Sequence, residues 1–163
     1  MYMATKSKRS VGSENKKDST QYYHEMARKA RAEALAIADT FKDKPQRFRI
    51  CNGIIMDVEV TKADIKTILG KNLDDEKFNY IKNKIAQDIH GFLTIAKYEG
   101  WAEVQPNKHP ECIYFVYYSK RNRRKVVLCV RKMRKTCVFK PYAIVSPIIL
   151  KTKRIKIKKG TPL

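Results

Sequence analysis

The segment YFVYYSKRNRRKVVLCVRK, residues 114–132, sets two apolar, β-like runs around a loop that is rich in Lys and Arg. The runs at 112–119 and 125–132 predict the two strands of a hairpin, with KRNRR as its loop. Residues 126–130, Val-Val-Leu-Cys-Val, are apolar at every position, which predicts a central strand buried on both faces. The hairpin therefore predicts a β-sheet in the C-terminal part of the chain.

The charge of the chain is distributed unevenly along its 163 residues, which carry a net charge of +20. Residues 1–111 hold 20 Lys and Arg together with all 16 Asp and Glu, whereas residues 112–163 hold 16 Lys and Arg and no acid. A disordered tail would lack the Ile, Val, Tyr and Phe that this second region contains. The pattern predicts a folded basic surface, and the polyanion that such a surface most often attracts is nucleic acid.

Several classes of protein are excluded by what the sequence lacks. No apolar stretch of signal-peptide type and no run of transmembrane length is present, so we expect the chain to fold in the cytoplasm and not to bind membranes. The cysteines are scattered without a CxxC pair, which predicts reduced thiols and no zinc site. Nucleotide-binding and common hydrolase motifs are missing, so we expect no cofactor.

The N-terminal part of the sequence predicts mainly helices. Residues 1–18 are polar and basic and are typical of a disordered arm. A stripe of mostly small residues at helical spacing predicts a closely packed helix over 20–42. Asn52-Gly53 between two β-rich runs favours a type I′ hairpin turn. Capping signals predict a short helix at 61–70 and a longer one beginning at residue 75, with Gly91 as a break or bend near its end.

The remaining strands complete an α+β expectation. Residues 141–150 predict a third strand with Pro147 at a bulge or edge, and 151–159 alternates Lys or Arg with Ile as a possible fourth. The predicted fold is one α+β domain, with N-terminal helices packed on a three- to four-stranded antiparallel sheet. We divide the chain into a disordered basic arm (1–18), the domain itself (19–159) with its leading helix (19–44), hairpin and helices (45–100) and basic sheet (101–159), and a tail (160–163).

Chemistry without a metal is the enzymatic option that the sequence leaves open. Cleavage of RNA through its own 2′-hydroxyl needs a base, an acid and cations around the phosphate. The candidate catalytic residues are His90 at the end of the long helix, His109 in the connection to the sheet, and Arg131 and Ser146 on the sheet.

Aromatic and basic residues of the sheet are the candidates for binding. Aromatic rings can stack on bases while neighbouring cations hold phosphates, which favours RNA over DNA as the partner. The candidate nucleic-acid-binding residues are Tyr114, Tyr117, Lys120, Arg121, Arg123, Arg124, Lys125, Lys132, Arg134 and Lys135.

The order of elements also resembles a known superfamily. Helices followed by a hairpin that Pro110, Glu111 and Tyr114 introduce, and then by RKVVLCVRK and YAIVS, are similar to the barnase/EndoU/colicin/RelE-type ribonucleases of phages and polymorphic toxins. The resemblance implies metal-independent RNA cleavage, with a histidine as acid or base, Arg131 on the phosphate and Ser146 on the third strand. Phage-type relatives often carry a histidine after the short helix, where this chain has Asn72, a departure that allows a binding-only relative.

The same resemblance has consequences for partners and location. A toxin would be covered by an acidic immunity or antitoxin protein, whose charge would speed association with the basic sheet. A phage or toxin module could also be associated with a virion or be delivered into a cytoplasm.

Two alternatives belong to other functional classes. The chain could be a non-catalytic nucleic-acid-binding or assembly protein, such as a ribosomal, virion or nucleoid component. It could also be a winged-helix-like DNA binder, with 62–69 and 75–90 as the helix pair and 112–132 as the wing, although a wing would normally end the domain.

Overall fold

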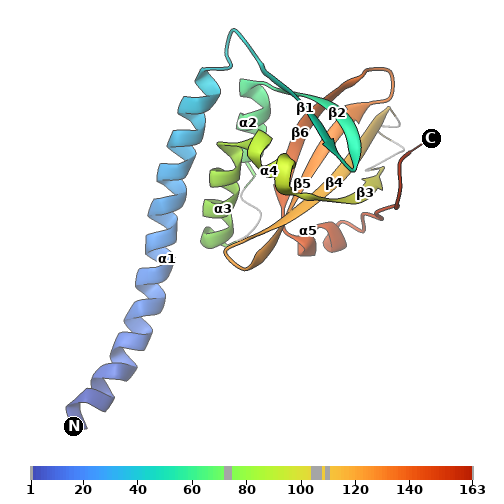
Figure 1. Cartoon of the computed structure of the whole chain (residues 1–163). Helices are drawn as coiled ribbons and strands as arrows, with labels where there is room; N and C mark the ends of the chain where they lie inside the picture. The colour runs from blue at the N-terminus through green and yellow to red at the C-terminus, as the bar shows by residue number, and fades with distance from the viewer. Residues whose placement is uncertain (1, 72–74, 104–107, 109–110, 163) are drawn as a thin grey trace.

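The computed structural model places helices on both faces of a single sheet (Figure 1). It describes the backbone of residues 2–71, 75–103, 108 and 111–162, and the side chains of these residues from Ser19 onward. The elements are α1 (Tyr2–Asp39), β1 (Gln46–Asn52), β2 (Ile54–Val60), α2 (Lys62–Leu69), α3 (Glu76–Ala86), α4 (Ile89–Ile95), β3 (Lys97–Ala102), β4 (Cys112–Arg121), β5 (Arg124–Met133), β6 (Val138–Val145) and α5 (Pro147–Thr152).

The sheet has six strands in the order β1-β2-β6-β5-β4-β3. The α+β class is confirmed, but the predicted number of strands, three or four, was too low, and one of the strand pairs is parallel. The early hairpin joins the same sheet, because β2 pairs with β6 in parallel through Asp57↔Val138 and Val58↔Phe139. Strand β3, which the sequence did not predict, pairs with β4 in antiparallel register.

The segment after β6 does not form the predicted fourth strand. Pro147 is the first residue of the short helix α5, a position where its missing N–H costs nothing. The following chain returns beneath the sheet and reaches β3, where Lys158 forms an isolated bridge with Trp101. The bulges of the sheet lie elsewhere, at Tyr142 of β6, opposite Cys129 and Val130, and between Tyr98 and Gly100 of β3.

The helices partly match their predicted ranges. The capping box of α2 is present, since the Thr61 side chain accepts from the Asp64 N–H and Asp64 accepts from the Thr61 N–H. The predicted long helix is divided into α3 and α4 at Asp88, whose side chain caps α4 by accepting from Gly91 N. Helix α1 continues back to Tyr2, where the sequence predicted a disordered arm, and its N-terminal half projects beyond the domain (Figure 1).

The type I′ geometry that was predicted for the β1–β2 turn occurs at the β4–β5 turn instead. At the first turn only Gly53 has a positive φ, 82°, so the turn is not the predicted type I′. Asn52 instead directs its side chain to the carbonyls of Leu93 and Ala96. At the β4–β5 turn both Asn122 (φ 50°) and Arg123 (φ 65°) have positive φ, as a type I′ turn requires.

Alternation along the central strands divides the core between the two faces of the sheet. Val126, Leu128 and Val130 of β5 pack in the large core beneath the helices. Val127 and Cys129 point to the opposite face, in a smaller core that contains Leu150 of α5. The prediction that this strand is buried on both faces is confirmed.

The alanine stripe of α1 packs against α3, as close packing was predicted. Ala27, Ala30, Ala34 and Ala38 are buried, which brings the two helix backbones near each other. Side chains of α3 then reach the backbone of α1, because Asn83 Nδ2 donates to Ala27 O at 2.9 Å and Gln87 Nε2 donates to Ala30 O at 2.9 Å.

Lys82 of α3 is a buried cation next to the C-terminus of α2. Its side chain is 2% exposed, and its Nζ donates to the carbonyl of Lys71. Arg31 of α1 donates nearby to Leu69 O at 2.6 Å. Burial, together with the charges of Arg31 and Lys71, lowers the pKa of Lys82 to about 8.

This pKa predicts that the protein becomes more stable as the pH rises from about 8 toward 10.5. In that window the folded state has released the Lys82 proton and the unfolded state still binds it, so the free energy of unfolding increases with pH. We expect a gain on the order of 1–2 kcal/mol between pH 7.5 and 9.5, measured by urea unfolding and absent in Lys82→Met. Lys84→Met, at an exposed position of the same helix, is the control. An equal gain in both variants would contradict the assignment.

Candidate nucleic-acid interface

Acidic residues from the first part of the chain neutralise several of the late cations. The acids come from β2, α2, the N-cap of α3, β3 and the residue after β3, and the cations from the C-terminal strands and tail. They are Arg124–Asp75 (2.8 Å), Lys125–Glu99 (3.3 Å), Arg134–Glu103 (3.2 Å), Lys140–Glu59 (3.5 Å), Lys140–Asp64 (3.1 Å) and Lys158–Glu103 (3.4 Å). Residues 112–163 contain no acid, but acids from earlier in the chain lie next to several of their cations in the folded protein.

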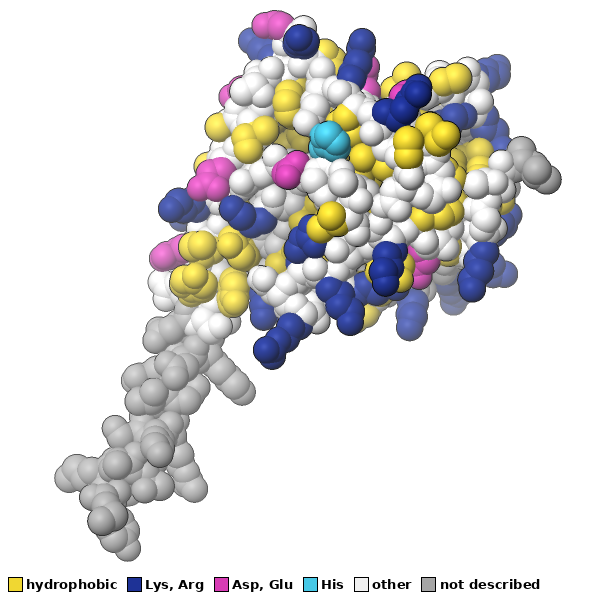
Figure 2. All heavy atoms as spheres, in the orientation of Figure 1, with side chains coloured by type: hydrophobic (Ala, Val, Ile, Leu, Met, Phe, Trp, Pro, Cys, Tyr) yellow, Lys and Arg dark blue, Asp and Glu magenta, His cyan; other side chains and the backbone are white. Residues whose placement is uncertain are grey.

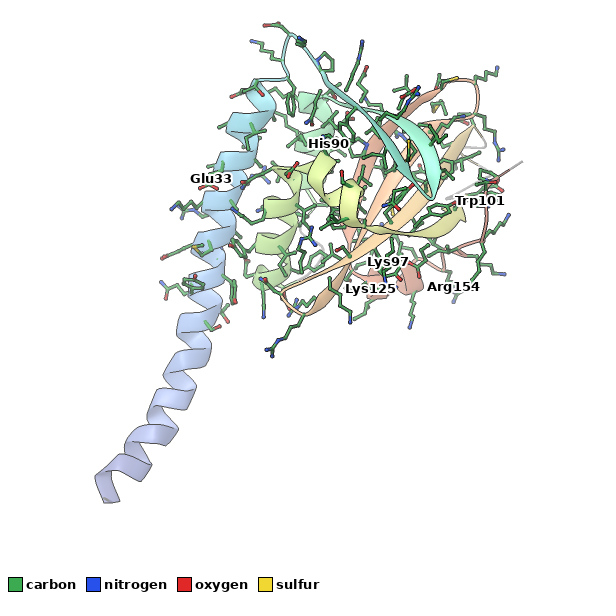
Figure 3. All side chains as sticks on the ribbon, in the orientation of Figure 1. Glu33, His90, Lys97, Trp101, Lys125 and Arg154 are labelled. Carbon is green, nitrogen blue, oxygen red and sulfur yellow. The ribbon has the colours of Figure 1, made fainter. Side chains whose placement is uncertain are left out.

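A second set of cations is exposed and has no acidic partner within the described part of the chain. Figure 2 shows Lys and Arg side chains along the lower side of the molecule, and Figure 3 labels Lys97, Lys125 and Arg154 on that side. We define the basic band as the exposed members of this set from β3, the β4–β5 hairpin and residues 151–156: Lys97, Lys120, Arg123, Lys151, Lys153, Arg154 and Lys156.

The tip of the β4–β5 hairpin is held by contacts on both faces. On the helix side, Arg124 Nη1 and Nη2 donate to Asp75 Oδ1 and Oδ2 at 2.8 and 2.9 Å. This hydrogen-bonded pair lowers the pKa of the Asp75 carboxyl, which also caps α3. On the other face, the Lys125 ammonium lies 4.2 Å from the centre of the Tyr118 ring. Lys120, Asn122 and Arg123 remain exposed at the tip.

The two tyrosines predicted to stack on bases are inside the protein. Tyr117 is 0% exposed and its hydroxyl donates to Asn52 O at 2.8 Å, because its ring points into the large core. Tyr114 is 5% exposed on the opposite face. Burial raises the pKa of both hydroxyls. Neither ring is available to a base here, so both leave the candidate interface.

The predicted basic residues divide between the two ends of β5. Lys120, Arg121, Arg123, Arg124 and Lys125 surround the turn, whereas Lys132, Arg134 and Lys135 lie at or beyond the other end of the strand. A ten-residue strand spans roughly 30 Å, so these are two separate regions. Arg134 pairs with Glu103. Of the two regions, only the one around the turn contributes to the basic band, through Lys120 and Arg123.

The predicted catalytic residues are not assembled into one site. His90 of α4 stacks on Phe48 with ring centres 4.3 Å apart, on the helix side of the sheet. Arg131 lies on the opposite face beside Tyr142. Ser146 is buried, and its Oγ has no hydrogen-bond partner among the described residues. His109 and the divergent Asn72 lie outside the described residues, so their predicted roles are untested.

A cluster around Tyr142 was missed by the sequence reasoning as a unit. The Tyr142 ring lies 4.2 Å from Lys71 Nζ and 5.2 Å from the Arg131 guanidinium carbon, and Tyr114 meets it edge-on with centroids 5.2 Å apart. The bulge opposite Cys129 places Tyr142 on the same face as Ala143. Lys71 comes from the loop after α2, and nothing in its local sequence indicates this contact. We call Lys71, Tyr114, Arg131 and Tyr142 the Tyr142 cluster.

The division between neutralised and exposed cations predicts different effects on stability. Arg124→Ala removes a bidentate ion pair and should lower the free energy of unfolding by about 0.5–1 kcal/mol. Lys120→Ala removes a cation that faces Lys125 across the hairpin, so its effect should stay within about 0.5 kcal/mol of zero or be stabilising. Urea unfolding at low salt measures both. Equal losses in the two variants would contradict this division.

No group of three or more His, Cys, Asp or Glu side chains that could hold a metal ion occurs among the described residues. Of the helices that the structure describes, none has the length and apolar character needed to cross a membrane. Comparison with protein family models, with curated proteins and with solved structures finds no match for this chain. The functional assignment therefore depends on the geometry of its own residues.

Proposed function

We propose that this protein binds nucleic acid through the basic band. The observation that carries the proposal is the way the ion pairs are distributed. Acids contributed by residues 59–103 pair with cations at the base of the hairpin turn, in the sheet and in the tail, while the band stays exposed and without a described acidic partner. Exposed cations of this kind bind phosphates and release the counterions that surround a nucleic acid.

The scaffold beneath the band supports the same proposal. The hairpin is central in the sheet, and its tip is tied to α3 through Asp75 and to β3 through Glu99. The segment after α5 is anchored by Ile155 and Ile157, which pack in the smaller core between exposed cations. Cations held on ordered backbone lose less conformational entropy on binding than cations on a flexible tail.

The choice between RNA and DNA is a matter for direct measurement. The sequence favoured RNA, partly because Tyr114 and Tyr117 were predicted to stack on bases. Both rings are buried, so that part of the argument is lost. RNA as the preferred partner is retained as a prediction from the resemblance alone.

Binding should depend strongly on salt and on the band. We expect the affinity for RNA or DNA oligonucleotides to fall as NaCl rises, with a slope that decreases by roughly 0.7–0.9 for each phosphate contact removed. Lys120→Gln combined with Lys153→Gln should therefore reduce the slope by about 1.5 in fluorescence anisotropy titrations. The control is Lys29→Gln with Lys44→Gln, which removes the same charge from exposed positions of α1 and its following loop. No binding at low salt, or equal losses in both double variants, would overturn the proposal.

Metal-independent RNA cleavage is a second candidate, supported by the Tyr142 cluster. Two cations that lie against the ring of Tyr142 can neutralise a phosphodiester, and the tyrosine hydroxyl can exchange a proton with it. In such a reaction the 2′-oxygen bonds to phosphorus and the bond to the 5′-oxygen breaks. One proton leaves the 2′-hydroxyl and one reaches the 5′-oxygen, which gives a cyclic 2′,3′-phosphate.

The cleavage candidate predicts that RNA is cut in the presence of EDTA. Tyr142→Phe should reduce the rate by a factor on the order of 10²–10⁴ if its hydroxyl transfers a proton. His109→Ala tests the acid or base that the resemblance implies. Tyr22→Phe, at an exposed position of α1, is the matched control. Intact RNA at high protein concentration, detected by denaturing gel, would remove the enzymatic candidate and leave the binding proposal standing.

An acidic protein partner follows only if the chain is a toxin. Such an immunity or antitoxin protein would cover the basic band and compete with nucleic acid. Competition between the two for the purified chain would support it.

A further inference from the structure

The end of the β4–β5 hairpin extends beyond the rest of the sheet. Pairing with β3 ends at Lys97↔Tyr118, and pairing with β6 ends at Val127↔Val145. Within the described strands, residues 119–126 therefore pair only with each other, as a two-stranded ribbon that ends in the Asn122-Arg123 turn. Figure 1 shows this ribbon reaching the lower end of α3.

Several features of the ribbon oppose its own stability. Lys120 lies directly opposite Lys125, and Arg121 directly opposite Arg124, and like charges in such positions repel. Arg123 has φ 65°, a left-handed conformation that favours glycine and costs a side chain such as arginine about 1–2 kcal/mol. The type I′ turn requires this backbone, and glycine would adopt it without strain. An arginine kept at a position that favours glycine points to a function for its side chain.

The base of the ribbon is nevertheless rigid. Arg124 is held by both carboxylate oxygens of Asp75, and Lys125 by Glu99 and the Tyr118 ring. Arg121 lies 5.2 Å from the centre of the Phe92 ring and donates to Ser119 Oγ at 2.8 Å. The exposed groups Lys120, Asn122 and Arg123 are thus presented from a fixed support, which lowers the entropic cost of binding.

The surroundings of the tip do not suit single strands. Proteins that bind single-stranded nucleic acid stack its bases on exposed aromatic rings. Residues 119–126 include no aromatic residue. Of the rings beside the ribbon, Tyr80 is half-buried in the pocket that Arg121 and Asn122 also line, and two others are covered. Lys125 covers Tyr118, and Phe92 is buried beneath Arg121.

We infer that the hairpin tip inserts into a groove of double-helical nucleic acid, with Asn122 and Arg123 at base edges and Lys120 at the phosphates. The inference rests on the proposed nucleic-acid binding and specifies its form. A two-stranded ribbon fits the major groove of B-form DNA, where asparagine and arginine can pair with adenine and guanine edges. An A-form RNA helix offers its wide, shallow minor groove instead.

The experiment compares affinities for 20-base-pair DNA, 20-base-pair RNA and the single strands of each by fluorescence anisotropy. We expect at least one duplex to bind roughly tenfold more tightly than its single strands. Arg123→Gly should weaken duplex binding by about tenfold, while its melting temperature is unchanged or higher because glycine relieves the left-handed strain. Lys44→Gly, which removes one exposed charge from the loop at the other end of the domain, is the matched control.

Arg123→Lys separates charge from shape, since it keeps the charge and the backbone strain but loses the planar guanidinium. It should bind duplex more weakly than the wild type if the arginine reads base edges. Single strands that bind as tightly as both duplexes, or an Arg123→Gly affinity equal to that of Lys44→Gly, would overturn the inference and leave the proposed function intact. No binding to any of the probes would overturn the proposed function itself.

Discussion

The burial of β5 on both faces is the constraint on which the rest of the structure depends. Its five consecutive apolar residues cannot face water on either side, so the sheet needs cover above and below. Helices α3 and α4 supply one cover through the large core, and α5 with Ile155 and Ile157 supplies the other. The second cover matters for function, because α5 lies toward the end of the sheet that carries the hairpin tip (Figure 1), and Lys153, Arg154 and Lys156 follow this helix in the chain.

The acids of the first part of the chain complete this arrangement. Asp75 both caps α3 and holds Arg124, so the helix that covers the core also fixes the position of the basic turn. Glu59 and Glu103 hold Lys140 and Lys158 in the same way. Each of these pairs is partly exposed and contributes modestly to stability. Their larger effect is to decide which cations remain available to a polyanion, a choice that neither composition nor net charge reveals.

The sequence predicted the elements whose local signals agree with the long-range packing. It did not predict the elements whose structure depends on pairing with a strand that is distant in the sequence. The β4–β5 hairpin and the α2 capping box follow from neighbouring residues, and both are present. Strand β3 resembles the end of a helix in sequence and becomes a strand because β4 offers an open edge. The parallel pairing of β2 with β6 joins residues about 80 positions apart, for which single-sequence patterns carry no signal. Asn52-Gly53 has the typical type I′ composition, yet Asn52 is used to bind α4.

The same distinction between local and long-range signals applies to the candidate site. The basic turn is visible in the sequence because its charges are adjacent, whereas the contact of Lys71 with Tyr142 depends on a loop closing against a bulged strand. The error at Tyr117 is of another kind. Alternation along the strand indicates which residues share a face with Tyr117, but it does not indicate whether that face is exposed or buried, and here it faces the large core. A strand with aromatic residues on both sides does not indicate which side is covered until its cover is known. Arg123 was selected for its charge, and the structure adds that this arginine occupies a left-handed turn position that favours glycine.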